Sequence, residues 1–319
     1  MSDHSANWSA DFANEISFAD GSFVDLGLHQ NQMAIMPLVF IRGDEIRPLG
    51  TCFSITNDGL CMTARHVIEE GVTLSAPPQR KTELDPERDG YFGALYISPE
   101  IHPEEPENLL GGFLPMYAIY TIDILDIALI KLSLPTDART GELLRFPAHP
   151  LRLRPPVVGE FAFALGYRAM TWEVDHEAKR QTLQQKYSAT KAVVEEVHLG
   201  GRDRVMLPFP SFRIAGRIDG GMSGGPMLDA QGQVMGVVCS SIPRGEDAQD
   251  SSYGSLIAPA MGMTLTVRDR DGGDRQAFLW DLVEGGPITV DRENVTVTRT
   301  GDDIQLALRG FHLNARLGS

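Results

Sequence analysis

The sequence predicts an all-β protein, and three patterns carry that prediction. Residues 53–68 (FSITNDGLCMTARHVI) partly alternate apolar and polar side chains on either side of an Asn-Asp-Gly turn, which is typical of a β-hairpin. Residues 126–132 (DIALIKL) contain an apolar run that suits one buried strand. Residues 287–308 alternate again and indicate two or three further strands.

The segment 216–228 (GRIDGGMSGGPML) places Ser223 among glycines. Gly221, Gly224 and Gly225 carry no Cβ, so the chain can turn sharply around the serine. Such a turn can aim the N–H groups of Gly221 and Ser223 at one point, where they would stabilise the oxyanion formed when a hydroxyl attacks a carbonyl. Glycine-rich turns more often serve as tight loops or phosphate cradles, so a catalytic interpretation also needs a base and a carboxylate.

Both groups precede Ser223 in the chain. His66 follows the predicted hairpin, where a strand becomes a helical turn, and Asp126 begins the apolar run of residues 127–130. An unpaired carboxylate entering a buried strand is costly to desolvate, so Asp126 is expected to have a hydrogen-bond partner. His66 is the obvious candidate.

The segments TARH, DIALIKL and GMSGGP, in the order His, Asp, Ser, resemble the three signature blocks of the trypsin-like serine peptidases. The resemblance covers about residues 35–265. It implies a chymotrypsin-like double barrel, in which two six-stranded antiparallel β-barrels hold the active site between them. Residues 163–169, 236–241 and 253–260 are similar to the strand that opens the second barrel, the substrate-binding strand and the closing strand.

The resemblance also implies roles for single residues. Ser223 becomes the nucleophile, His66 the general base and then the general acid, and Asp126 the group that fixes the imidazole tautomer. The amides of Gly221 and Ser223 form the oxyanion hole. Asp123 competes for the orienting role, but the family pattern favours the acid directly before the Ile-Ala-Leu-Ile run. The expected activity is that of a serine endopeptidase that uses an acyl-enzyme intermediate and no cofactor.

Two departures from the secreted digestive enzymes matter. Met222 stands where those enzymes carry the Asp that receives a new N-terminus during activation, so the chain resembles the bacterial, zymogen-free branch related to the HtrA and DegP proteins. Cys239 stands where they carry a hydroxyl donor to the catalytic Asp, and a thiol donates more weakly. A second hypothesis is therefore a conditionally active or non-catalytic protease-fold binding module gated by a partner. An α/β-hydrolase esterase is disfavoured, because that fold places Ser before Asp and His.

In this family, the substrate pocket is built from residues shortly before the nucleophile and from the substrate-binding strand. If Arg217 points into this pocket, it would disfavour Lys or Arg at the cleavage site and could favour an acidic residue. A surface Arg217 would instead pair with Asp219 or Glu173. The candidate pocket residues are Arg217, Ile218, Cys239, Ser240 and Ser241.

Composition limits the other function classes. The net charge of −15 argues against nucleic-acid binding, because phosphate contacts need clustered Lys and Arg. The first residues show neither a basic nor an apolar signal region, and no later segment is apolar enough for a membrane span, so a cytoplasmic protein without membrane contact is expected. The three cysteines, Cys52, Cys61 and Cys239, are interpreted as reduced core thiols, and no metal site is expected. Protein or peptide substrates follow from the resemblance, and a regulatory partner or a homo-oligomer stays open.

The chain is divided into an N-terminal extension (1–34), a peptidase domain of two barrels (35–265) and a C-terminal β-rich extension (266–319). Six prolines between residues 77 and 117 predict a long loop insertion before Asp126. The basic segment 177–191 is helix- or loop-prone, and residues 269–274 (DRDGGD) predict a turn.

Overall fold

The structure, a computed structural model, describes residues 8–18, 23–25, 33–43, 45–74, 90–101, 109–136, 141–175, 180–242, 251–268, 271–293, 295–308 and 311–317. Strands dominate these ranges, and the prediction of an all-β fold is confirmed. The helices in the described residues are α1 (Arg65–Leu74), α3 (Leu279–Glu284) and the 3-10 helix η2 (Ala258–Gly262). No described helix has the length and apolar character needed to cross a membrane.

The first barrel closes in the order β3-β4-β5-β8-β7-β6, with every pair antiparallel. Its interior is filled by large apolar side chains such as Phe40, Phe53 and Ile130, all at most 2% exposed. The strands are β3 (Ile35–Arg42), β4 (Glu45–Ser54), β5 (Leu60–Thr63), β6 (Tyr91–Ile101), β7 (Leu109–Thr121) and β8 (Ala128–Leu132).

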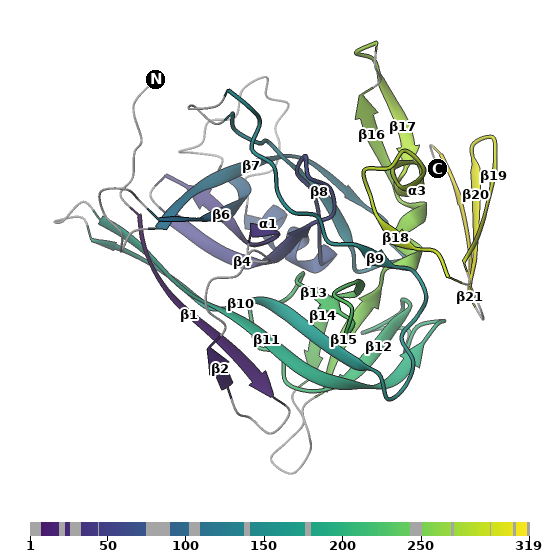
Figure 1. Ribbon diagram of the computed structural model, residues 1–319, viewed down its shortest axis with the longest axis horizontal. Helices are drawn as coiled ribbons and strands as arrows, with labels where there is room; N and C mark the ends of the chain where they lie inside the picture. Colours follow the sequence, from purple (N-terminus) through teal and green to yellow (C-terminus); the bar gives the residue numbers. More distant parts are fainter. Residues whose placement is uncertain are drawn as a thin grey trace.

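The second barrel follows the order β10-β13-β14-β15-β12-β11 and is closed by the antiparallel pairing of β10 with β11. The predicted double barrel of two six-stranded antiparallel sheets is therefore confirmed. In Figure 1 the two barrels lie against each other, and α1 lies near the centre of the molecule where they meet. The strands are β10 (Phe161–Asp175), β11 (Arg180–His198), β12 (Ser211–Ala215), β13 (Pro226–Leu228), β14 (Val234–Ile242) and β15 (Ser251–Leu256).

Several local predictions are confirmed. The hairpin at residues 53–68 is formed by β4 and β5, with Phe53 opposite Met62, and α1 begins at Arg65, directly before His66. The segments 163–169 and 236–241 lie in β10 and β14. Of the segment 253–260, residues 253–256 lie in β15, the last strand of the second barrel along the chain, and residues 258–260 lie in η2. Cys52, Cys61 and Cys239 are buried and form no disulfide.

Two local predictions are wrong. Residues 91–101 and 109–117 belong to β6 and β7 and not to a loop insertion, while residues 77–89 and 102–108 lie outside the described residues. Pro99 is accommodated because the β6–β7 pairing jumps from Ile97 to Ile101, so no ladder hydrogen bond is needed there. Residues 180–191 are part of β11, which pairs with β10 on one side. Pairing with neighbouring strands outweighs their weak local preference for helix or loop.

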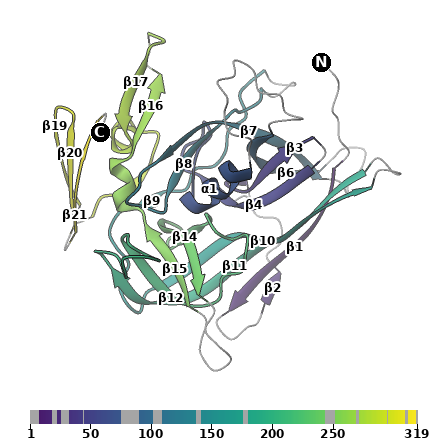
Figure 2. The same cartoon turned by 180° about the vertical axis from the view of Figure 1, so that it is seen from behind.

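The N-terminal segment adds to the second barrel. β1 (Trp8–Phe18) pairs with β11 in parallel, and β2 (Phe23–Asp25) pairs with β1. The C-terminal segment forms a hairpin of β16 (Thr264–Arg268) and β17 (Asp274–Phe278), then α3, and then a three-stranded sheet. Figures 1 and 2 show β1 and β2 on the opposite side of the molecule from this sheet.

The two or three strands predicted in residues 287–308 are confirmed, since β18 (Val290–Asp291), β19 and β20 lie there, and the C-terminal sheet continues beyond residue 308. Its strands are β19 (Thr296–Thr300), β20 (Asp303–Leu308) and β21 (Phe311–Arg316). Ile304, Leu306 and Leu313 belong to the hydrophobic cluster that includes the core of the first barrel and part of the second, and Leu313 packs close to Gly262 of η2. The C-terminal segment is thus part of the common core.

A short strand connects the linker between the barrels to the second barrel and to the C-terminal segment. β9 (Leu151–Arg152) pairs in parallel with β14 and with β18 (Val290–Asp291). The fully buried Arg152 guanidinium binds Glu160 and lies 3.1 Å from Asp229, whose side chain is also fully buried. Since each buried charge has an opposite charge as partner, the network compensates part of the cost of desolvation.

Candidate active site

His66 and Asp126 meet where α1 begins and where the chain enters β8. The imidazole Nδ1 lies 2.8 Å from Asp126 Oδ2, and the backbone N–H of His66 donates to Asp126 Oδ1 at 3.0 Å. Asp126 is only 13% exposed, whereas the His66 side chain is 42% exposed. Two hydrogen bonds from one residue fix the carboxylate and orient the ring, leaving Nε2 as the nitrogen available for proton transfer.

The competitor Asp123 lies elsewhere. It is 95% exposed and forms an ion pair with Arg65 Nη1 at 3.1 Å. The same Arg65 group donates to the Ile122 carbonyl at 3.3 Å, and Arg65 Nε binds Glu69 at 2.7 Å. Arg65 therefore links the start of α1 to the loop that carries Asp126.

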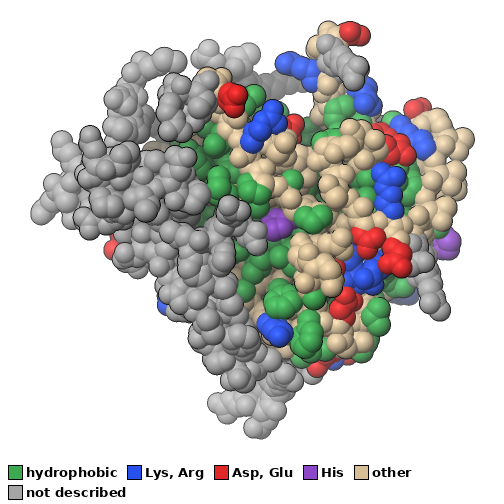
Figure 3. Space-filling model, in the orientation of Figure 1, with side chains coloured by type: hydrophobic (Ala, Val, Ile, Leu, Met, Phe, Trp, Pro, Cys, Tyr) green, Lys and Arg blue, Asp and Glu red, His purple; other side chains and the backbone are tan. Residues whose placement is uncertain are grey.

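The pKa of His66 responds to opposing influences. Burial lowers it, but the hydrogen bond and charge of Asp126, followed by the charges of Glu70 and Glu69, raise it above its ordinary value. In Figure 3 one histidine side chain is visible near the middle of this face, with hydrophobic side chains among its neighbours. A base near the surface with a raised pKa can accept a proton from a bound nucleophile.

Ser223 lies on a turn between β12 and β13 that packs against the first barrel. A Cβ at Gly50 would lie 2.8 Å from the Ser223 carbonyl oxygen and 2.9 Å from Val67 Cγ1, so the serine backbone lies close to the residue after His66. A Cβ at Gly224 would lie 2.2 Å from Thr63 Oγ1, and this glycine adopts a φ of +86°, so no other residue fits there without strain. In the described part of the chain, no hydrogen bond joins the His66 ring to the Ser223 hydroxyl.

The same turn presents two unbonded amides. Gly221 has a φ of +93°, and neither its N–H nor that of Ser223 has an acceptor among the described residues. The two amides that follow are hydrogen-bonded. The Gly224 N–H donates to the carbonyl oxygen of Val238, and the Gly225 N–H donates to the carbonyl oxygen of Met222. Two free N–H groups within three residues can bind an oxyanion.

The candidate pocket residues occupy different environments. The Arg217 side chain is 72% exposed and binds Asp219 at 2.7 Å, which is the surface pairing considered from the sequence. Ile218 is buried, and its N–H donates to Ser252 Oγ at 3.1 Å. The Cys239 thiol donates to the Tyr253 carbonyl oxygen at 3.3 Å. The side chains of Ser240 and Ser241 lie outside the described residues.

Thr51 is a residue of the site that sequence reasoning missed. Its hydroxyl and its N–H bind the carbonyl oxygens of Gly221 and Ser223, each at 2.8 Å. No local pattern could have indicated it, because these partners are about 170 residues away in the chain.

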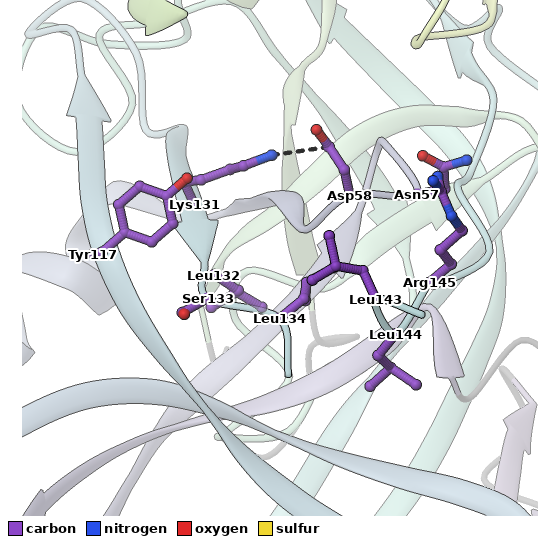
Figure 4. Close-up of a pocket in the computed structure, with 10 residues that line it drawn as sticks. All are labelled: Asn57, Asp58, Tyr117, Lys131, Leu132, Ser133, Leu134, Leu143, Leu144 and Arg145. Atoms are coloured by element: carbon purple, nitrogen blue, oxygen red, sulfur yellow. Dashed lines mark ion pairs between the residues drawn. The ribbon is translucent and has the colours of Figure 1, made fainter. Parts of the chain in front are cut away.

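A cavity of about 200 Å³ lies at the other end of the first barrel. Figure 4 shows the Asp58–Lys131 ion pair, 2.9 Å long, across it. Lys131 pairs with Leu60 and Ala128 pairs with Thr63, so β5 and β8 separate the cavity from His66 and Asp126. The cavity is therefore not part of the candidate active site.

Comparison with known proteins agrees with this fold. The profile of the trypsin-like peptidase domain matches residues 50–237, more than half of the chain, and the chain belongs to this family. The match includes His66, Asp126 and Ser223. Members of such a family act on proteins or peptides. No curated protein matches the chain.

Solved structures of proteases are similar to the chain at low sequence identity. The active form of the Rv3671c protease from M. tuberculosis is 16% identical, with a TM-score of 0.44 over 71% of this chain and 77% of that one. Its inactive form is 18% identical, with a TM-score of 0.41 over 71% and 84%. The apo MamO protease domain from Magnetospirillum magneticum is 13% identical, with a TM-score of 0.42 over 72% and 94%.

Proposed function

We propose that the protein is a serine endopeptidase that hydrolyses peptide bonds through Ser223, His66 and Asp126. The double hydrogen bond from His66 to Asp126 is the observation that carries this proposal, because an oriented imidazole is what a serine nucleophile requires. Apo active sites often have a loose nucleophile-to-base contact that shortens when substrate binds, so the missing His66–Ser223 hydrogen bond is compatible with this role.

The reaction proceeds in two steps. Ser223 Oγ attacks the peptide carbonyl while His66 Nε2 takes its proton, and the N–H groups of Gly221 and Ser223 bind the oxyanion. The protonated His66 then gives the proton to the leaving amine, which leaves an acyl ester on Ser223. A water molecule, deprotonated by His66, hydrolyses that ester and restores the serine.

Activation by N-terminal cleavage is not part of the proposal. Met222 is 1% exposed and carries no charge that a new N-terminus could neutralise. This supports a place in the zymogen-free, HtrA-related branch of the family.

The test is intact-mass analysis after treatment with a fluorophosphonate, with Ser223→Ala and His66→Ala alongside. We expect one adduct per wild-type molecule and none in either variant, together with hydrolysis of a peptide library by the wild type. A wild-type protein with neither adduct nor hydrolysis would contradict the proposal and direct attention to a gating partner.

A matched pair of aspartates tests the assignment of the acid. Asp126→Asn should lower kcat by about 10⁴-fold, because it reverses the hydrogen-bonding role of the group that faces Nδ1. Asp123→Asn, which changes an exposed carboxylate three residues away, should change kcat by no more than about threefold. Equal losses in the two variants would rule out the special role of Asp126.

A further inference from the structure

We propose that Thr51 is a positioning residue that holds the oxyanion hole open, so that the enzyme is active without cleavage or a partner. This inference rests on the proposed function and concerns the regulation of the same site. Thr51 lies on β4 of the first barrel, whereas the nucleophile turn belongs to the second.

Thr51 binds both residues that supply the hole. Its Oγ1 donates to the Gly221 carbonyl oxygen at 2.8 Å, and its N–H donates to the Ser223 carbonyl oxygen at 2.8 Å. The carbonyl groups of these two residues are therefore fixed from one point, and their N–H groups stay unbonded in the described part of the chain.

The anchor itself is immobile. Thr51 is fully buried, its Oγ1 accepts the N–H of Tyr167 at 3.0 Å, and its carbonyl oxygen accepts the Thr63 hydroxyl at 2.7 Å. The hydroxyl thus donates to one partner while it accepts from another, which sets both its rotamer and the direction of its proton. Valine has nearly the same shape but can make neither bond.

The turn needs such an anchor on its N-terminal side. Residues 219–225 contain four glycines, and Gly221 is free to adopt either sign of φ, so the amide of Gly221 can rotate out of the hole at little cost. On the C-terminal side, Gly224 and Gly225 pair with Val238, at 2.8 and 2.9 Å. The hydroxyls of Ser252 and Thr190 donate to carbonyl oxygens at the start of the turn, those of Gly216 and Arg217, whereas Thr51 Oγ1 donates to the carbonyl oxygen of Gly221 itself.

Met222, the residue before the nucleophile, is buried and uncharged, so its side chain forms no ion pair that could fix this turn. The Thr51 hydroxyl supplies a fixed hydrogen bond from the other barrel, which forms as soon as the barrels pack. The hole is then preformed, as electrostatic stabilisation of a transition state requires.

The experiment compares Thr51→Val with Thr51→Ser and with Thr56→Val. Thr56 is also buried, but it lies in the turn between β4 and β5 at the far end of the first barrel, where its hydroxyl donates to Asp58 and accepts the N–H of Leu60 at 3.1 Å. Thr56→Val therefore removes a buried hydroxyl that is bonded neither to Thr51 nor to the nucleophile turn. We expect Thr51→Val to lower kcat and the rate of fluorophosphonate labelling by about 10²-fold, the effect of losing one oxyanion donor, with KM changed less than about threefold. Thr51→Ser and Thr56→Val should label within about threefold of the wild type.

Labelling by Thr51→Val at the wild-type rate, or an equal loss in Thr56→Val, would overturn the inference. Hydrogen exchange of residues 216–228 gives a readout that needs no catalysis. Faster exchange of this segment in Thr51→Val than in Thr56→Val supports the anchor even if the wild type does not label and the proposed function fails, and equal exchange overturns it.

If Thr51→Val does not fold, an apo crystal structure of the wild type tests the hydrogen bond from Thr51 to Gly221. A Thr51 Oγ1 within hydrogen-bonding distance of the Gly221 oxygen supports the inference. A broken contact with both amides still facing the site overturns it.

Discussion

At the scale of single residues, the charge around His66 controls the pH at which the site can work. His66 must be neutral to accept a proton, so the acidic limb of kcat/KM follows its pKa in the free enzyme. Asp126, Glu70 and Glu69 raise this pKa against the effect of burial. Activity should therefore fall on acidification at a higher pH than an isolated histidine would dictate.

Glu70→Gln tests this directly, because Glu70 is exposed on α1. Removing its negative charge should lower the pKa of His66 and move the acidic limb of kcat/KM to lower pH. The displacement should shrink in high salt, since exposed charges are screened. The measurement is a pH profile at two ionic strengths, with Glu284→Gln on α3 as a control that leaves the limb in place. A limb that stays fixed or moves to higher pH would contradict the electrostatic account.

At the scale of elements, the buried network around β9 joins the linker to the second barrel. Arg152→Leu leaves the fully buried Asp229 without its cation, and removal of one member of such a pair typically costs about 3–5 kcal/mol of unfolding free energy. Asp229 Oδ1 also accepts the N–H groups of Gln231 and Gln233, at 2.9 Å each, so the turn between β13 and β14 should loosen too.

Arg154→Leu is the matched control. Arg154 lies two residues away, is 32% exposed and is 3.6 Å from Asp291, so its loss should cost less than about 1 kcal/mol. Urea denaturation of both variants measures the difference. Similar costs would show that the buried pair contributes no more than a surface one.

The same scale shows what the sequence could and could not predict. The hairpin of β4 and β5 and the apolar run of β8 were expected as strands from their local patterns, and β10 and β14 were expected from the family resemblance. β6, the first part of β7 and β11 were not expected, because the pairing that holds them is nonlocal. Pro99 in β6 is tolerated at an irregular pairing, and the polar residues of β11 are held by strands on both sides.

The residues of the candidate site also divide into those with a local sequence signal and those without one. His66, Asp126 and Ser223 stand in short local motifs, so the sequence alone predicts them as candidates, together with the amides of Gly221 and Ser223. Thr51 contributes through a hydroxyl in the other barrel, and its role depends on how two distant segments pack. Contacts of this kind are a product of the tertiary structure and leave no periodic pattern in the chain.

At the scale of the whole molecule, one hydrophobic cluster joins the first barrel, part of the second barrel and the C-terminal sheet, which predicts one cooperative transition. Leu306 is 1% exposed, and Leu306→Ala should lower the unfolding free energy by about 2–5 kcal/mol. Calorimetry should show the entire peak moving to lower temperature.

Gln305→Ala changes the neighbouring residue, whose side chain is exposed on the other face of the sheet, and should alter the free energy by less than about 0.5 kcal/mol. A separate early peak in Leu306→Ala, with the main transition unmoved, would show instead that the C-terminal sheet unfolds as an independent unit.

The parallel pairing of β9 with β18 has a consequence for biosynthesis. Leu151 lies beside Val290 and donates its N–H to the carbonyl oxygen of Thr289 at 2.8 Å, so this contact cannot form until the chain has been synthesised past residue 290. His66, Asp126 and Ser223 all emerge from the ribosome earlier. A nascent chain therefore holds every member of the proposed triad before the pairing of β9 with β18 can secure the linker between the barrels.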